Sequence, residues 1–401
     1  MRLFHCATDE EIKRGETTDV YFTRTKRILE AKGLEKLKAL AEVTSGRLPQ
    51  SWPWGIICGI EEEARLFEGC QVDVYAMPEG SVFHHRDRRG IREPVMFIEG
   101  PYGEFCVLET PMLGLICQAS GVATSAARTK KVAGEKMVVA FGIRRMHPAL
   151  CPMLDRAAYI GGFDGVSSLK GAEAARIEPT GTMPHALVIV FQDQAKAWKA
   201  FDEVMPPDVP RIALVDTYFD EKMEAIMAAN ALKDRLDGVR LDTPTSRKGD
   251  FAEIVREVRW ELDIRGYQHA KILVSGGLNE ESVRILSEAG ADAFGVGTSV
   301  SNAPTLNFAM DIVELEGKLS AKRGKLGGKK QVWRCPECLT DTVLPFKSRP
   351  PKCPTCKTEA APMLKPLVKD GKIVAKLPEP KEIRKYVLEQ IEKLSLENAS
   401  H

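Results

Sequence analysis

The sequence predicts an α/β protein with a parallel α/β barrel at its centre, an α+β region before the barrel and a small cysteine-bearing module after it. Short apolar runs alternate repeatedly with segments of helical periodicity between residues 111 and 305. Such alternation is typical of right-handed βαβ units in a parallel sheet. No glycine-rich dinucleotide fingerprint follows the first of these runs, which favours a barrel over a doubly wound sheet.

The length and composition indicate an ordinary multidomain globular protein. A chain of 401 residues exceeds what one hydrophobic core usually serves, so we expect roughly two or three domains. Lys and Arg number 57 against 56 Asp and Glu, a balance that gives no general attraction to nucleic acid or to an anionic membrane. We recognise no secretory signal and no long apolar span, and therefore expect a cytoplasmic protein that binds neither nucleic acid nor membrane.

Changes in composition and periodicity along the chain suggest four regions. Short apolar runs broken by Gly and Pro predict an α+β domain over residues 1–110. The barrel is expected over residues 111–316, and a basic segment with the cysteine module over 317–375. A C-terminal helix and tail complete the chain at 376–401.

The expected strands and helices of the barrel region alternate along the chain. Apolar runs that we expect to be buried strands occupy residues 136–141, 163–167, 186–191, 212–216, 239–242, 272–275 and 293–296. Helical spacing of apolar residues covers 221–232, 251–264 and 280–288, and a surface helix is expected over 380–396. In a barrel, functional side chains lie where strands end and loops begin.

Four cysteines form two C-P-x-C pairs, Cys335 with Cys338 and Cys353 with Cys356, with 14 residues between the inner cysteines. Four thiolates at this spacing predict a closed, structural zinc ribbon without an open catalytic position. The ribbon spacing favours zinc over an iron–sulfur centre. The alternative is a set of four surface cysteines without metal.

Two glycine-rich loops predict a phosphate cradle. Ser275, Gly276 and Gly277 end one expected strand, and Gly295-Val-Gly297-Thr298 ends the next. Glycines allow backbone amides to approach a phosphate, and the last βα loops of barrels often hold one. Glycines of tight turns are the alternative explanation for each loop alone.

Several other strand ends carry polar or aromatic residues. Phe141 followed by Arg144 could stack a flat ring and bind its carboxylate, although a solvated Arg is common. Asp216, Arg240 and Asp242 follow two further strands, where carboxylates could bind ribose hydroxyls or magnesium, or cap a helix.

His185 follows Gly181-Thr182-Met183-Pro184 and precedes an apolar run. A histidine at such an edge could accept a phosphoryl group, act as a base or be a hydrogen-bonded core residue.

In order, these segments resemble nicotinate phosphoribosyltransferase of the archaeal type with a C-terminal zinc knuckle. The resemblance covers nearly the whole chain and includes T-T-D-V-Y-F-x-R-T at 17–25, Y-A-M-P-E-G at 75–80, A-S-G-V-A-T at 119–124, F-G-I-R-R-M-H-P at 141–148, D-R-A-A-Y-I-G-G at 155–162, G-T-M-P-H-A at 181–186, L-V-D-T at 214–217, V-R-L-D-T-P at 239–244, V-S-G-G-L at 274–278, F-G-V-G at 294–297 and the two cysteine pairs.

The resemblance implies an incomplete α/β barrel of the type II phosphoribosyltransferase kind, under an N-terminal α+β domain. It also implies transfer of the phosphoribosyl group of phosphoribosyl pyrophosphate to nicotinate, with magnesium, in a homo-oligomer whose sites lie between subunits. His185 matches the family's transiently phosphorylated histidine, and whether ATP hydrolysis is coupled to synthesis stays open.

The resemblance assigns a role to each matching residue. Tyr21 and Phe141 would enclose the nicotinate ring, Arg144 would bind its carboxylate, and Asp216 would act with magnesium and pyrophosphate. His185 and Asp216 are the expected catalytic residues. The expected substrate-binding residues are Tyr21, Phe141, Arg144, Thr182, Arg240, Asp242, Ser275, Gly276, Gly277, Gly295, Gly297 and Thr298.

Three alternatives remain at this point. Quinolinate phosphoribosyltransferase shares the S-G-V-A-T stretch, but its strand-end D-T-R-K-T is absent and F-G-I-R stands in the comparable place. A nicotinamide-specific relative is disfavoured by Arg144. A nucleic-acid-binding zinc ribbon is disfavoured by the net charge of +1 and the aromatic content of 7%.

Overall fold

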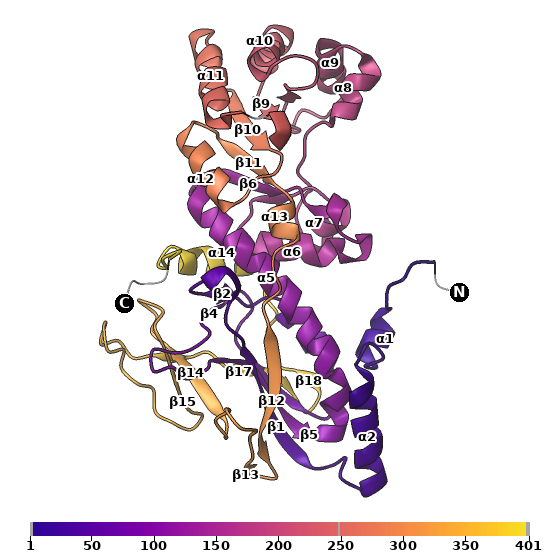
Figure 1. Cartoon of the computed structure of the whole chain (residues 1–401), viewed down its shortest axis with the longest axis vertical. Coiled ribbons are helices and arrows are strands. Elements are labelled where there is room, and N and C mark those ends of the chain that lie inside the picture. The colour runs from indigo at the N-terminus through magenta and orange to yellow at the C-terminus, as the bar shows by residue number, and fades with distance from the viewer. Residues whose placement is uncertain (1–2, 248, 398–401) are drawn as a thin grey trace. The chain divides into compact units, whose positions relative to one another are not determined.

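The computed structural model describes residues 3–247 and 249–397 and divides into two compact units. The first unit joins Met1–Thr124 to Pro304–His401, and the second consists of Ser125–Ala303 (Figure 1). These units change at Thr124 and Ala303, whereas the sequence predicted boundaries at 110 and 316. The segment Pro304–His401, which includes the predicted cysteine module and C-terminal helix, belongs to the first unit.

A seven-stranded sheet organises the first unit, with the order β13-β12-β1-β5-β3-β17-β18 and antiparallel pairing throughout. Its strands are β1 (Lys38–Ser45), β3 (Asp73–Ala76), β5 (Pro94–Pro101), β12 (Phe308–Leu315), β13 (Lys318–Leu319), β17 (Lys365–Lys369) and β18 (Lys372–Ile373). Pairing of β12 with β1 places residues 308–315 in this sheet, although the sequence predicted them as part of the barrel region.

Helices and smaller sheets complete the first unit. Apolar residues of α3 and α5 join those of the seven-stranded sheet in one core, with Leu66, Phe67, Met112 and Ile116 among them. The helices are α1 (Asp9–Lys13), α2 (Val20–Lys32), α3 (Ile60–Phe67), α4 (Tyr102–Phe105), α5 (Glu109–Ala133, which continues into the second unit) and α14 (Pro380–Ile391). The smaller sheets are β2 (Gly55–Ile56) with β4 (Val82–Phe83), and β15 (Asp341–Pro345), β14 (Lys330–Arg334) and β16 (Ala361–Pro362) in that order.

The expectation that the chain has no long apolar span is wrong, because the helical segment Tyr102–Ala133 has the length and apolar composition of a membrane span. Its most apolar window is 61% buried inside the protein, as in the core helix of a globular fold.

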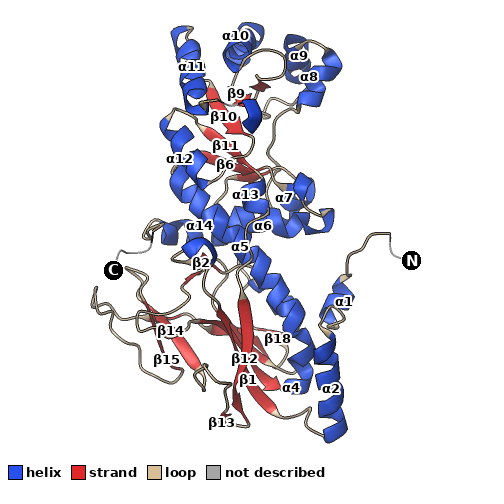
Figure 2. Ribbon diagram, viewed as in Figure 1, coloured by secondary structure: helices blue, strands red, loops and turns tan. Residues whose placement is uncertain are grey.

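A six-stranded parallel sheet organises the second unit, with the order β7-β6-β11-β10-β9-β8. Its strands are β6 (Met137–Ala140), β7 (Gly165–Val166), β8 (Ile212–Leu214), β9 (Gly238–Leu241), β10 (Lys271–Ser275) and β11 (Ala293–Val296). Figure 2 shows helices along these strands. They are α6 (Cys151–Ile160), α7 (Leu169–Ala175), α8 (His185–Phe191), α9 (Gln194–Val204), α10 (Glu221–Leu232), α11 (Phe251–Ile264), α12 (Glu280–Glu288) and α13 (Thr298–Ser301).

Local capping explains why the later helices begin where the sequence predicted. The side chains of Asp220, Asp250 and Asn279 accept hydrogen bonds from backbone N–H groups in the first turns of α10, α11 and α12. The predicted bounds of these three helices are confirmed, as are those of β11.

One predicted strand is wrong. Residues 186–191 lie in α8, where Val188 is buried while Ile189 and Val190 are largely exposed. A short apolar run does not distinguish a strand from a helix by periodicity, and Pro184 immediately precedes the helix.

Candidate active site

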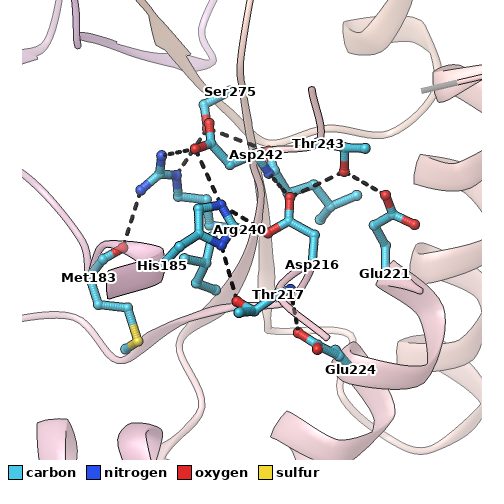
Figure 3. A network of polar contacts seen from close by, with 12 residues as sticks. Met183, His185, Asp216, Thr217, Glu221, Glu224, Arg240, Asp242, Thr243 and Ser275 are labelled. Carbon is cyan, nitrogen blue, oxygen red and sulfur yellow. Dashed lines mark hydrogen bonds and ion pairs between the residues drawn. The ribbon is translucent and has the colours of Figure 1, made fainter. Parts of the chain in front are cut away.

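Polar side chains from three neighbouring strands and one helix meet in the second unit (Figure 3). Asp216 follows β8, Arg240 and Asp242 lie at the end of β9, and Ser275 ends β10, while His185 begins α8. Because β8, β9 and β10 are parallel neighbours, their carboxyl ends lie at one edge of the sheet. The structure therefore brings these five predicted residues together.

Arg240 is the most highly connected member of this network. Its Nε donates to Ser275 Oγ at 2.9 Å, and Nη1 donates to Thr182 Oγ1 at 2.9 Å and to the Met183 carbonyl at 3.3 Å. Its Nη2 lies 2.9 Å from Asp242 Oδ2. The guanidinium is thus fixed in orientation, and the hydroxyl of Thr182, predicted to bind substrate, accepts one of its hydrogen bonds.

Asp242 remains ionised at neutral pH. Burial opposes ionisation, but the contact with His185, the charge of Arg240 and the hydrogen bond from Ser275 outweigh it and lower the pKa of Asp242. Ser275 Oγ donates to Asp242 Oδ1 at 2.6 Å. The Ser275 hydroxyl thereby links Arg240 to Asp242, and its contact with phosphate stays a prediction.

Asp216 has the opposite character. Burial raises its pKa to about 6, although His185 and the backbone N–H of Asp242 work against this. Asp216 Oδ2 accepts from that N–H at 2.6 Å and from Thr243 Oγ1 at 3.2 Å. Its buried Oδ1 accepts no hydrogen bond among the residues that the structure describes, and it lies 3.6 Å from His185 Nε2.

His185 lies between the two carboxylates. Its Nε2 is 3.6 Å from Asp216 Oδ1 and 3.6 Å from Asp242 Oδ2, and its Nδ1 is 3.1 Å from Thr217 Oγ1. Contact with Asp242 and the charge of Asp216 raise the pKa of His185, against the effect of burial. The half-exposed ring faces functional groups, so the structure does not favour a core role.

Phe141 lies beside the network. The Arg240 guanidinium carbon is 5.4 Å from the centre of the Phe141 ring. A Cβ atom on Gly295 would overlap that ring, so Gly295 makes room for Phe141. Arg144 lies nearby in sequence, in a short 3₁₀ turn (Ile143–Arg145), and is exposed.

The glycine loops can present backbone N–H groups to a phosphate, whereas the helix N-terminus that follows the first loop is less suited to an anion. Gly276 and Gly277 have positive φ angles of 86° and 69°, a conformation that glycine adopts without strain. The α12 N-terminus is already capped by Asn279, and its first turn carries Glu280 and Glu281, which disfavours an anion there. The other loop provides Gly297 and the exposed Thr298 at the start of α13.

Sequence reasoning missed four supporting residues: Thr217, Glu221, Glu224 and Thr243. Thr243 Oγ1 donates to Glu221 as well as to Asp216. The L-V-D-T and L-D-T motifs contained both threonines, but the two glutamates lie on an ordinary helical pattern and no sequence signal marked them.

Two predicted sites lie in the first unit. Tyr21 is on α2 and 56% exposed, and its hydroxyl donates to Asp19 Oδ2 at 3.5 Å. The four sulfur atoms of Cys335, Cys338, Cys353 and Cys356 all lie within 4.8 Å of one another.

The two cysteine pairs have the same local conformation. The N–H of Leu339 donates to the Cys335 carbonyl and the N–H of Lys357 to the Cys353 carbonyl, both at 3.0 Å. Leu339 and Lys357 have positive φ angles of 58° and 64°. Sulfurs around a tetrahedral zinc ion would be about 3.8 Å apart, from a Zn–S distance of about 2.3 Å, so the arrangement fits zinc.

Family models match both parts of the chain. The N-terminal domain of quinolinate phosphoribosyl transferase matches residues 19–120, and its C-terminal domain matches residues 122–311. Nicotinate phosphoribosyltransferase of Bacillus subtilis is 29% identical over 364 residues, covering 79% of this chain and 72% of its own.

Solved structures agree with this match. The crystal structure of nicotinate-nucleotide pyrophosphorylase from Pyrococcus furiosus is 54% identical in sequence, with a TM-score of 0.95, and the match covers 99% of this chain and 100% of that one. Human nicotinic acid phosphoribosyltransferase, at 20% identity, shares the fold with a TM-score of 0.72 over 94% of each chain.

Proposed function

This chain belongs to the phosphoribosyltransferase family of quinolinate and nicotinate enzymes, and on that premise we propose that it joins nicotinate to phosphoribosyl pyrophosphate. The products are nicotinate mononucleotide and pyrophosphate, so the role is NAD biosynthesis by salvage. The observation that carries the proposal is the meeting of Arg240, Asp242, Asp216, Ser275 and His185 at one sheet edge.

The network suits this chemistry. The pyridine nitrogen attacks C1 of the ribose, forming an N–C bond while the C–O bond to pyrophosphate breaks and its electron pair leaves with pyrophosphate. The reaction needs positioning and charge stabilisation more than a protein nucleophile. Asp242, kept ionised by its low pKa, can accept hydrogen bonds from the ribose hydroxyls and stabilise positive charge that develops on the sugar.

Magnesium bound to pyrophosphate would neutralise the leaving group. Carboxylate oxygens are the ligands that this ion prefers, and Asp216 Oδ1 is a buried carboxylate oxygen without a hydrogen-bond partner in the described part of the chain. Asp216 therefore fits the ion, and the amides of Gly276, Gly277 and Gly297 are suited to the 5′-phosphate.

Acid recognition is assigned to Phe141 and Arg144. An exposed Arg in a turn after β6 is free to close on a carboxylate when the ring stacks on Phe141. Arg144→Ala should raise the nicotinate KM by about tenfold to over a hundredfold, the value of one charge-assisted contact, with little change for phosphoribosyl pyrophosphate. Unchanged nicotinate kinetics would contradict this assignment.

Quinolinate is the second candidate substrate, because both matching family models describe quinolinate enzymes. Quinolinate has one carboxylate more than the nucleotide product, so its use must release CO₂. The deciding assay supplies phosphoribosyl pyrophosphate and magnesium with nicotinate, nicotinamide or quinolinate in parallel. Product from nicotinate without CO₂ supports our proposal, and CO₂ release from quinolinate alone would replace it.

Coupling to ATP would act through His185. Its position between two carboxylates and near the glycine loops suits a phosphoryl group only if magnesium compensates the added negative charge. His185→Asn should abolish any stimulation by ATP while leaving slower ATP-independent synthesis. Acid-labile label from γ-labelled ATP on the peptide that contains residue 185 would support coupling, and its absence together with no stimulation would exclude it.

Three structural features complete the proposal. We assign the six-stranded parallel sheet to an incomplete barrel and the four cysteines to a zinc ribbon with a structural role, which the open parallel sheet and the grouped sulfurs support. The enzyme acts in the cytoplasm as a homo-oligomer in which Tyr21 of one copy completes the site of another. Mixing inactive Tyr21→Ala and Arg144→Ala chains should restore activity, and no recovery after proven subunit exchange would favour a site within one chain.

A further inference from the structure

Glu224 is a fully buried acid that the proposed reaction does not use. It lies in the first turns of α10, and its carboxylate points back to the loop that leaves β8. Glu224 Oε2 accepts from the backbone N–H of Thr217 at 3.1 Å, and Oε1 accepts from those of Tyr218 at 2.7 Å and Phe219 at 2.9 Å. One carboxylate thus binds three consecutive backbone amides.

This carboxylate restrains the loop through its backbone. The side chains of Tyr218 and Phe219 are 47% and 58% exposed, so apolar packing contributes little to fixing residues 217–219. Hydrogen bonds from backbone amides to an ionised carboxylate are among the stronger hydrogen bonds in proteins, particularly where water is excluded. The position of the loop therefore depends on Glu224.

The loop in turn determines the surroundings of His185. Asp216 and Thr217 are consecutive, and both face the imidazole: Thr217 Oγ1 lies 3.1 Å from Nδ1 and Asp216 Oδ1 lies 3.6 Å from Nε2. Figure 3 shows Thr217 between Glu224 and His185, with a polar contact to each. A shift of the loop would move both contacts together.

We propose that Glu224 is a positioning residue for the reaction, acting through the Thr217–Phe219 loop on Asp216 and His185. This inference rests on the proposed function for its kinetic consequence, but its structural consequence can be measured without any substrate. Displacing a catalytic group by about 1 Å costs up to about a hundredfold in rate, so the effect should appear in kcat.

Glu224→Gln is the decisive variant because it keeps the size of the side chain. A carboxamide has one acceptor oxygen and one NH₂ group, so it must present a donor to at least one of the loop amides. We expect kcat to fall by about tenfold to a hundredfold, with a much smaller change in nicotinate KM. The ¹⁵N and ¹H signals of His185 should also shift in its substrate-free NMR spectrum.

Gln194 provides the matched control. Its Nε2 donates to Glu224 Oε1 at 3.3 Å, and among the described residues no hydrogen bond joins Gln194 to residues 217–219. If Glu224 merely joined α9 to α10, Gln194→Met would reproduce the losses of Glu224→Gln. We expect this control to keep the kcat and the His185 signals of the unmodified protein.

Thr217 supplies a second test if Glu224→Gln does not fold. Thr217→Val removes the hydroxyl and keeps the shape, whereas Thr217→Ser keeps the hydroxyl, so valine should lower kcat more than serine and alone shift the His185 signals. Equal effects of the two, or unaltered kcat and His185 signals in folded Glu224→Gln, would overturn the proposal. If the unmodified protein makes no nicotinate mononucleotide, the proposed function fails, while the NMR comparison still decides the role of Glu224.

Discussion

Replacing Asp216 by Asn should make the protein more stable at neutral pH while impairing catalysis. The Asp216 side chain is only 3% exposed, and its pKa is raised from 3.8 to about 6, mainly by burial. The folded state therefore holds a proton that the unfolded chain releases between about pH 4 and pH 6, so ionisation of Asp216 progressively costs stability across that window. Asparagine can still accept the Asp242 and Thr243 hydrogen bonds with its one amide oxygen.

The magnitude follows from the two pKa values. Linkage gives a stability gain for Asp216→Asn of about 1 kcal/mol near pH 4.5 and about 3 kcal/mol near pH 7.5, where both states are ionised in the wild type. Asp216→Asn also removes the attraction that raises the pKa of His185, so these figures are upper values.

Urea unfolding at the two pH values tests this reasoning. The control is Asp193→Asn, because hydrogen bonding to the Lys196 N–H lowers the pKa of this helix-capping carboxyl, so removing its charge should not stabilise the protein. Equal stability of Asp216→Asn and wild type near pH 7.5, or the same increment at both pH values, would refute the burial argument. A lower kcat in the same variant would show that the buried charge of Asp216, which costs stability, is needed for activity.

Three further predictions follow from the geometry. Arg240→Met should destabilise the protein by about 3–5 kcal/mol, since Asp242 loses its guanidinium partner and keeps the contacts with Ser275 and His185, whereas Arg240→Lys should cost about 1.5–3 kcal/mol because the charge remains but the guanidinium fork is lost. Urea midpoints equal to wild type would contradict the network. Gly295→Ala should displace the Phe141 ring and raise nicotinate KM more than phosphoribosyl pyrophosphate KM, and equal changes in steady-state kinetics would argue against ring stacking on Phe141. Elemental analysis should find about one zinc per chain. Cys338→Ser should lose this zinc and expose residues 330–362 to proteolysis, while the thermal transition of the second unit stays unchanged. Full zinc content in that variant would count against a four-cysteine site.

Local sequence signals predicted much of the secondary structure of the second unit. Helices α10, α11 and α12 begin after Asp or Asn caps, and the apolar periodicity of each helix is visible within its own residues. Their bounds, and the placing of Asp216, Arg240, Asp242 and Ser275 at strand ends, were therefore predictable. Residues 186–191 were not, because six apolar residues fit either a buried strand or a short helix, and α8 leaves Val190 exposed.

The sequence by itself determined the family, the alternation of strands and helices, the cysteine pairs and most residues of the site, because each is written in consecutive residues or fixed spacings. The tertiary structure decided that β12 and β17 return to the first sheet, since backbone hydrogen bonds look alike at every position and leave no local mark of their partner. It also decided that the Thr182 hydroxyl accepts a hydrogen bond from Arg240 and that Glu224 binds the loop beside His185. Those roles depend on where neighbouring strands and helices place a side chain in space, and spacing along one segment does not contain that information.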